Sequence, residues 1–291
     1  MVDSTEILSL RNVSLSYENI EVFRDISFVV SKGSFYYLTG ESGAGKTSLL
    51  RLIYIDNLEY QGKIKLFEQN IKVLPRRTLP HIRQRIGVVK QEPGLIAHLT
   101  ILQNTMLPLL IQGISPSKAS RRAFQVLSWI GLQNYLEQLP SMLSGGHSQM
   151  AALARALVIN PKIVIADEPT GNLDMKNARK LMTIFETLHK LGTTIVIATH
   201  NQTIVQEFRH PEVRLENKHL LFIHEQEAVS QTGTNSTTPS PAIATHASKV
   251  TDTASGESLP HMQKITPLPK TEGRTSVHKS PYSSFYNTIN P

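Results

Sequence analysis

A glycine-rich stretch near the start of the chain constrains its fold more than any other feature. The residues GESGAGKT, Gly40 to Thr47, match the phosphate-loop pattern G-x-x-x-x-G-K-[ST] in full. The apolar run FYYLT precedes them and the run SLLRLIYI follows, which predicts a buried strand, a turn and a helix in that order. We therefore expect an α/β fold that holds the phosphates of a nucleotide at this turn.

The residue types in this loop suit phosphate binding. Glycines let the backbone wrap a phosphate with its N–H groups. Lys46 is expected to neutralise the β- and γ-phosphates, and Thr47 to hold Mg²⁺ through its hydroxyl. The predicted nucleotide-binding residues of this stretch are Gly40, Glu41, Ser42, Gly43, Ala44, Gly45, Lys46, Thr47 and Ser48.

A second candidate for the site is the run IVIADE. Four apolar residues predict a buried strand, and the acid that follows them, Asp167, is placed to reach Mg²⁺ through water. Glu168, one residue further on, is placed to polarise an attacking water. Two acids after a strand are weak evidence alone, but downstream of a complete phosphate loop they predict a catalytic pair.

Two more polar residues end apolar runs of the same kind. His200 ends TTIVIATH and is either a polar residue at a strand end or a contact for the γ-phosphate or the attacking water. Gln91 follows RIGVVK and is placed to touch Mg²⁺ or the water while leading into a helical segment.

A second glycine-containing stretch, LSGG, precedes the helix-forming run AALARAL. Its serine and glycines stand at a helix N-terminus, where free N–H groups and the positive end of the helix dipole attract anions. A helix cap is the alternative explanation of this stretch taken by itself.

The order of these elements resembles the ATP-binding subunits of ABC transporters. It runs through Tyr17, GESGAGKT, Gln91, LSGG, IVIADEPTGNLD and ATH. Within that family the chain is most similar to the FtsE group, which acts in bacterial cell division. The similarity lies in GESGAGKTSLLRLIY, LPHIRQRIGVVKQ, MLPLLIQGIS and DEPTGNLD, and the lipoprotein-releasing and macrolide-export ATPases share much of it.

The resemblance implies ATP and Mg²⁺ as cofactors and gives the residues roles. Tyr17 would stack on adenine, and Gln91 would lie in the loop that faces a transmembrane partner. His200 would be the switch histidine. The implied catalytic residues are Glu168, His200 and Lys46, and the implied metal ligands are Thr47, Gln91 and Asp167.

In this family LSGG caps the ATP bound to the opposite subunit, so a second copy of the chain or a paralogous ATPase would complete the site. The residues implied to act in trans are Ser144, Gly145, Gly146, His147 and Asp174. The chain departs from the usual pattern after LSGG, where the family has Gln or Glu, then Gln-Gln-Arg. Here the residues are His147, Ser148, Gln149 and Met150, which puts the rate and the strength of dimerisation in question.

The resemblance implies an ATPase that transmits conformational change through an FtsX-like integral membrane partner during cell division. An exporter ATPase and a nucleotide-sensing scaffold with little turnover are the alternatives. No nucleic-acid partner is expected, because soluble ABC-type ATPases of ribosomes or DNA usually carry two such domains or a long coiled-coil insert.

The expected fold is a P-loop NTPase of ABC type, with a mixed sheet core, an antiparallel β subdomain and an inserted α-helical subdomain. It would span residues 5–223, with the helical insert at about 95–142. The insert rests on the helical spacing of Ala123, Val126, Leu127 and Ile130. Residues 224–291 are rich in Ser, Thr and Pro and predict a disordered tail.

Composition excludes several classes of protein. The 291-residue chain has no cysteine, so it has no disulfide framework and no cysteine–zinc site. No apolar run approaches the ~18 residues of a membrane span, and the first residues do not resemble a signal peptide. The expected location is peripheral, at the cytoplasmic face of the inner membrane.

Overall fold

The computed structural model describes residues 6–18 and 20–223, and the predicted tail at 224–291 lies outside the described residues. The strands are β1 (Glu6–Tyr17), β2 (Ile20–Ser31), β3 (Phe35–Thr39), β4 (Gln61–Leu66), β5 (Gln69–Asn70), β6 (Ile86–Val89), β7 (Ile163–Asp167), β8 (Thr194–Ala198), β9 (Glu212–Glu216) and β10 (His219–Ile223). The helices are α1 (Lys46–Ile53), α2 (Leu79–Arg83), α3 (Ile101–Ile111), α4 (Pro116–Ile130), α5 (Gly145–Leu157), α6 (Met175–Lys190) and α7 (Gln202–Glu207), with short 3₁₀ turns η1 (Ile71–Val73), η2 (Arg76–Thr78) and η3 (Pro140–Met142).

Strands from both halves of the described chain form a six-stranded sheet in the order β10-β9-β3-β8-β7-β6. The three apolar runs predicted as parallel strands are β6, β7 and β8, and β3 pairs in parallel with β8. Only the hairpin partner β10 runs antiparallel within this described sheet. Since parallel strands point the same way, the polar residues that follow β3, β6, β7 and β8 gather at one edge.

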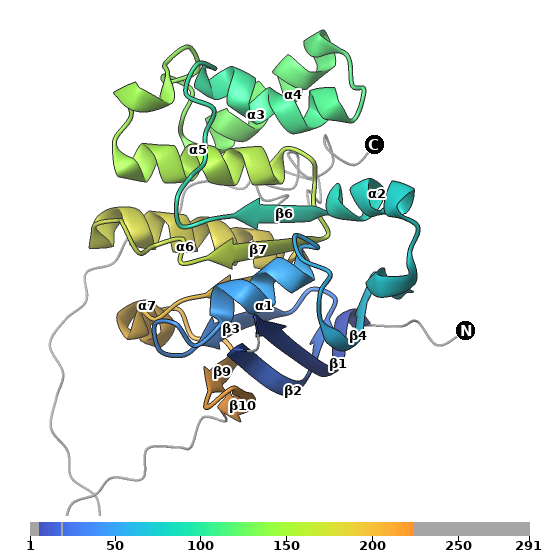
Figure 1. The fold of residues 1–291 in the computed structure, drawn as a ribbon. Helices are drawn as coiled ribbons and strands as arrows, with labels where there is room; N and C mark the ends of the chain where they lie inside the picture. Colours follow the sequence, from blue (N-terminus) through green and yellow to red (C-terminus); the bar gives the residue numbers. More distant parts are fainter. Residues whose placement is uncertain (1–5, 19, 224–291) are drawn as a thin grey trace, which may run out of the picture. The chain divides into compact units, whose positions relative to one another are not determined.

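The parallel strands β3, β6, β7 and β8 are largely buried on both faces, which explains why they are continuously apolar. Alternate residues of β7 show this most simply. Ile163 and Ile165 face the core that includes β1, β2 and α1, whereas Val164 and Ala166 face the core that includes α3 to α6. Figure 1 shows the helices α3, α4 and α5 gathered at one end of the described domain and the strands β1, β2 and β4 at the other.

The antiparallel strands predicted near the start of the chain form a separate sheet in the order β2-β1-β4-β5. The predicted helical insert contains α3 and α4. Pro116 begins α4, and Gly131 ends it with a left-handed φ of 90°. All four apolar residues that indicated this helix are buried. The predicted fold class is therefore confirmed.

The helix after the phosphate loop is shorter than the sequence pattern predicts. The apolar run continues to Ile55, but α1 ends at Ile53. Ile55 takes a left-handed φ of 64°, which a helix does not accommodate, and its side chain is buried. Burial of this side chain in the core therefore prevails over helix continuation.

Among residues 6–18 and 20–223, no helix has both the length and the apolar character needed to cross a membrane.

We propose a domain boundary near residue 223, and a truncation tests it. Removing residues 225–291 is expected to shift the melting temperature by less than about 3 °C, because the removed sequence has no core-forming pattern. Thermal unfolding of the two proteins under identical conditions checks this. A drop of 10 °C or more would mean that the domain extends beyond residue 223.

Candidate functional site

The phosphate loop joins β3 to α1. Glycines stand where the backbone requires them: Gly40 has a φ of 142° and Gly45 a φ of 102°. A Cβ at Gly40 would lie 2.4 Å from the Leu215 carbonyl oxygen, and one at Gly45 would lie 2.7 Å from a methyl of Val22. The loop therefore packs too closely on neighbouring strands to admit side chains at these two positions.

Replacement of Gly40 by alanine is expected to destabilise the nucleotide-free protein by about 1–3 kcal/mol, because it combines backbone strain with a clash against main chain. Gly43 is a matched control. Its φ of 80° also disfavours alanine, but a Cβ there would meet nothing within 4 Å. Urea unfolding should show a larger loss for Gly40→Ala than for Gly43→Ala. Equal losses would contradict the close packing of the loop.

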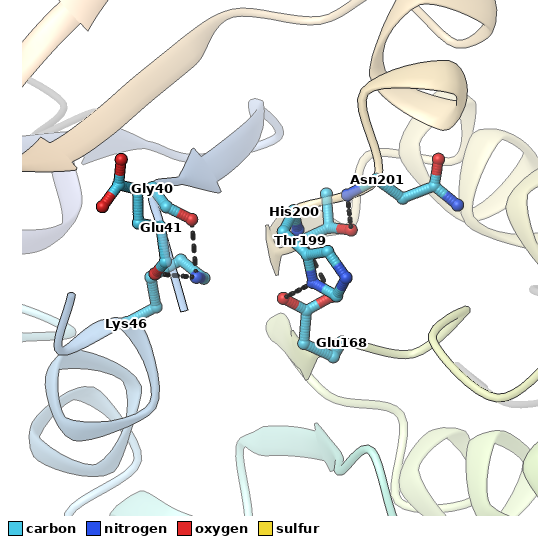
Figure 2. A network of polar contacts seen from close by, with 7 residues as sticks. All are labelled: Gly40, Glu41, Lys46, Glu168, Thr199, His200 and Asn201. Carbon is cyan, nitrogen blue, oxygen red and sulfur yellow. Dashed lines mark hydrogen bonds and ion pairs between the residues drawn. The ribbon is translucent and has the colours of Figure 1, made fainter. Parts of the chain in front are cut away.

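Lys46 begins α1 and is only 7 % exposed. Its ammonium group donates hydrogen bonds to the carbonyl oxygens of Gly40 at 2.8 Å and Glu41 at 2.9 Å (Figure 2). Both acceptors are neutral, so the positive charge remains available to an anion within the loop. Ser42 and Ala44 complete the loop, and the first turn of α1 contains Thr47 and Ser48.

Asp167 is the last residue of β7. The nearby Thr47 hydroxyl favours the ionised carboxylate, but burial has the larger effect and raises the pKa of this aspartate. Its Oδ1 atom is buried and has no hydrogen-bond partner among the described residues. A buried carboxylate oxygen without a donor is costly, so a ligand at this position would relieve it.

These residues fit Mg²⁺. The ion prefers oxygen ligands and usually binds one or two carboxylates together with waters and phosphates. The hydroxyl of Thr47 and the unpartnered oxygen of Asp167 supply two such ligands side by side. The described residues contain no cluster of three or more His, Cys, Asp or Glu side chains suited to a metal.

Replacement of Asp167 by asparagine is expected to raise the melting temperature of the nucleotide-free protein at pH 7. The folded state raises the pKa of Asp167, so the ionised form destabilises the fold above that pKa, and asparagine removes this cost. The advantage should shrink as the pH falls through the folded pKa, where Asp167 itself becomes neutral. Thermal melts over a pH series check this, and a less stable variant at pH 7 would contradict it.

Glu168 follows β7 and is 9 % exposed. Its Oε1 atom lies 2.7 Å from His200 Nδ1, and its Oε2 accepts the His200 backbone N–H at 3.3 Å (Figure 2). Glu168 also has a left-handed φ of 45°, a strained conformation for a residue other than glycine. The carboxylate is thus held by two contacts from one neighbour, while the His200 side chain is itself 64 % exposed.

Tyr17 and Gln91 lie at the ends of β1 and β6. The Tyr17 ring is 40 % exposed, and its hydroxyl lies 3.5 Å from the side-chain nitrogen of Asn57. Gln91 is exposed and its amide lies beside Gly171, in the loop after Glu168. A cleft of about 380 Å³ opens where these loops meet the start of α5, with Gln91, Gly145, Gln149 and Asn172 in its lining.

The second glycine stretch caps α5. The Ser144 hydroxyl accepts the His147 backbone N–H at 3.3 Å and lies 3.2 Å from Nδ1 of the same histidine. The His147 ring packs on Tyr135, with ring centroids 4.4 Å apart. Within the described residues, no hydrogen bond or ion pair joins the stretch from Ser144 to His147 to the phosphate loop.

Asp174 caps α6 in the same way. Its Oδ1 accepts the Asn177 backbone N–H at 2.9 Å and its Oδ2 accepts the Asn177 side-chain N–H at 2.5 Å, and these bonds lower the pKa of Asp174. A Cβ at Gly146 would lie 2.8 Å from Asn177, so this asparagine links the starts of α5 and α6. No motif in the sequence points to Asn177. The available signal was its position three residues after the helix-capping Asp174, where a side chain can contact the cap.

Two residues of α5 hold the segment that contains Gln91, a role that no sequence motif indicates. The side chain of Gln149, which is buried, donates to the Lys90 carbonyl at 2.9 Å. Arg155 donates to the carbonyls of Pro93 at 2.7 Å and Gly94 at 2.8 Å. A polar residue such as Gln149 on the apolar face of a helix was the available signal, because buried polar groups need hydrogen-bond partners.

A strand, a glycine-rich phosphate loop and a helix, with acids at the end of a neighbouring parallel strand, define a P-loop nucleoside triphosphatase. The family model described as "ABC transporter" matches residues 23–171. The chain belongs to the ABC transporter family, as one of its ATP-hydrolysing cassettes.

Individual relatives agree with this assignment. The chain is 37 % identical over 212 residues to the cell division ATP-binding protein FtsE of Streptococcus pneumoniae serotype 2 (strain D39), which covers 72 % of this chain and 92 % of the relative. It is 34 % identical to FtsE of Bacillus subtilis (strain 168), covering 72 % and 93 %. It is also 30 % identical to the methionine import ATP-binding protein MetN of Clostridioides difficile (strain 630), covering 77 % and 70 %.

Solved structures show the same fold. A dimeric structure of MJ0796, described as a bacterial ABC transporter cassette, superimposes with a TM-score of 0.69 at 31 % identity, covering 73 % of this chain and 96 % of that one. A post-hydrolysis dimer of the same cassette, bound to ADP and Pi, gives a TM-score of 0.69 at 30 % identity, with the same coverage.

Proposed function

We propose that this chain is the FtsE-like ATPase of a membrane complex, and that it transmits ATP-driven conformational change through an integral membrane partner during bacterial cell division. The hydrolytic part of the proposal is carried by one observation: Glu168 is held by His200 at the strand edge that also bears the phosphate loop. The cell-division part is supported by the similarity to FtsE proteins over nearly their whole length.

The proposed reaction converts ATP and water to ADP and phosphate. Lys46 neutralises the β- and γ-phosphates as negative charge moves toward the leaving group. Glu168 orients the attacking water and accepts its proton, and His200 holds the Glu168 carboxylate in place. The backbone N–H groups of the loop from Gly40 to Gly45 bind the phosphate oxygens.

Thr47 and Asp167 would hold Mg²⁺, with Gln91 added from the segment after β6. When bound, the ion would offset phosphate charge and fix the orientation of the β- and γ-phosphates. Tyr17, exposed at the end of β1, offers a ring face on which adenine could stack.

The stretch from Ser144 to His147 and Asp174 would complete the site of a second copy. Ser144 caps a helix whose N-terminus can bind an anion. The related cassette MJ0796 is dimeric in both of its structures. A symmetric pair of chains would form two equivalent sites.

Depletion of the protein from its native bacterium separates the candidate processes. The proposal expects filamentous cells that fail to divide, with rescue by the parent chain and not by a Glu168→Gln chain. Normal division with loss of methionine uptake would favour a MetN-like role, for which the MetN similarity is the supporting observation. Normal division with failure of lipoprotein release or macrolide resistance would favour an exporter.

A further inference from the structure

The positive charge of this protein is concentrated in one segment. The whole chain has 30 Lys and Arg, 23 Asp and Glu, and a net charge of +7. Residues 61–90 contain eight of those bases and a single acid, Glu68, so this segment alone accounts for the net charge of +7. Its basic residues are Lys63, Lys65, Lys72, Arg76, Arg77, Arg83, Arg85 and Lys90.

Acidic neighbours do not compensate these charges. None of the eight forms an ion pair with any residue of the described ranges. Those that are held have neutral partners: Arg83 donates to the Ile55 carbonyl at 2.7 Å, and Arg85 lies 3.8 Å from the ring centre of Phe67. In the part of the chain that the structure describes, no hydrogen bond or ion pair engages the side chain of Arg76 or Arg77.

Residues 71–83, which form η1, η2 and α2, present their charges outward. Ile71, Leu79 and Ile82 are buried in the core that includes β1, β2 and α1. Arg76 and Arg77 are exposed. Because apolar side chains hold the segment against the domain, the arginines form part of its outer surface. We call this surface, residues 71–83, the basic surface.

The nucleotide site does not use the basic surface. The phosphate loop, Glu168 and Gln91 follow the carboxyl ends of parallel strands, whereas α2 precedes the amino end of β6. Figure 1 shows α2 at the end of β6 opposite its arrowhead. A second copy that completes the nucleotide site would thus leave the basic surface free.

We propose that the basic surface binds the anionic headgroups of a lipid membrane. Val73 is 74 % exposed and lies between Lys72 and Arg76 in the chain, and an apolar side chain among bases suits the boundary between headgroups and acyl chains. Residues 224–291 contain five bases and five acids. Their net charge is therefore zero, and they supply no excess of negative charge that would neutralise the basic surface.

Nucleic acid fits the basic surface less well. Proteins that bind single strands combine basic grooves with exposed aromatic rings on which bases stack. Residues 61–90 contain one Phe, Tyr or Trp side chain, Phe67. The guanidinium group of Arg85 lies over its ring, so the ring face is not open to a base. The membrane inference extends the proposed function, because a subunit of a membrane complex works beside headgroups, but it concerns lipid and not the membrane protein.

Co-sedimentation of the full-length chain with vesicles tests the inference without any membrane partner. Vesicles of equal parts phosphatidylcholine and phosphatidylglycerol should bind the protein, more weakly as salt rises, and vesicles of phosphatidylcholine should not. The double variant Arg76→Gln with Arg77→Gln should bind about 30-fold more weakly, because each base near an anionic surface contributes about five-fold. The matched variant Lys118→Gln with Arg121→Gln, two exposed bases on α4, should bind like the parent.

Three outcomes would overturn the inference: no preference for anionic vesicles, equal binding by the Arg76/Arg77 variant and the parent, or tighter binding to single-stranded RNA than to vesicles. Thermal stabilisation by Mg-ATP, measured in parallel, reports on the proposed function separately. It should be the same in the parent and in both double variants. Loss of that stabilisation in the parent would count against the proposed ATPase and leave the lipid result standing.

Discussion

Replacement of Glu168 by glutamine is expected to slow ATP hydrolysis by about 10²–10⁴-fold while ATP binding persists. Glutamine keeps one oxygen that can accept the His200 backbone N–H, and its amide N–H can donate to a neutral His200 Nδ1, so the local structure should remain. It cannot take a proton from water, so the chemical step should fail. Single-turnover hydrolysis and ATP binding, measured on the same protein, check the two halves of this expectation.

The same variant should accumulate as a dimer in Mg-ATP, because ATP between two copies is no longer consumed. Light scattering with and without nucleotide measures this. Glu207→Gln is the matched control, since Glu207 pairs with Arg179 on the surface and should be dispensable for hydrolysis. Hydrolysis by Glu168→Gln within a few-fold of the parent rate would remove this residue from the catalytic site.

Replacement of Lys46 by alanine is expected to weaken ATP binding by at least about 10²-fold, because a charge-assisted contact within the loop is lost. The lysine is buried and bound to two loop carbonyls, so no other cation occupies its position within the described loop. Calorimetric titration with Mg-ATP checks the affinity. Lys32→Ala, an exposed lysine in the turn after β2, is the matched control. Near-parental affinity in Lys46→Ala would refute the phosphate-loop assignment.

The local parts of the site could be predicted from the sequence because their information is local. The phosphate loop is a contiguous motif, and the strands β6, β7 and β8 are short β-branched runs with polar ends. The contact between Glu168 and His200 is different. It depends on β7 lying next to β8, with Asp167 opposite Ala198, and strand order is not written in either run.

Contacts that depend on packing could not be predicted in the same way. The end of α1 at Ile53 follows from burial of Ile55, which only the assembled core decides. The hydrogen bond from the Gln149 side chain to the Lys90 carbonyl joins residues 59 positions apart. The role proposed for the Ser144 stretch needs a second chain, and only the resemblance to ABC cassettes indicates it.

The central claim is that two copies of this chain share each nucleotide site, and mixing two inactive variants tests it most directly. Lys46→Ala removes the phosphate loop's cation, and Gly145→Asp places a negative charge at the start of α5. Gly145 has room for a side chain, since a Cβ would lie 3.9 Å from the Asn172 carbonyl oxygen. Each variant alone should be inactive, because every site would contain one damaged half.

In an equal mixture, random pairing makes about half of the dimers mixed. Each mixed dimer has one intact site and one site with both halves damaged. The mixture should therefore recover about a quarter of the parent ATPase rate. A mixture as inactive as either variant alone, with mixed dimers shown to form, would contradict the shared site.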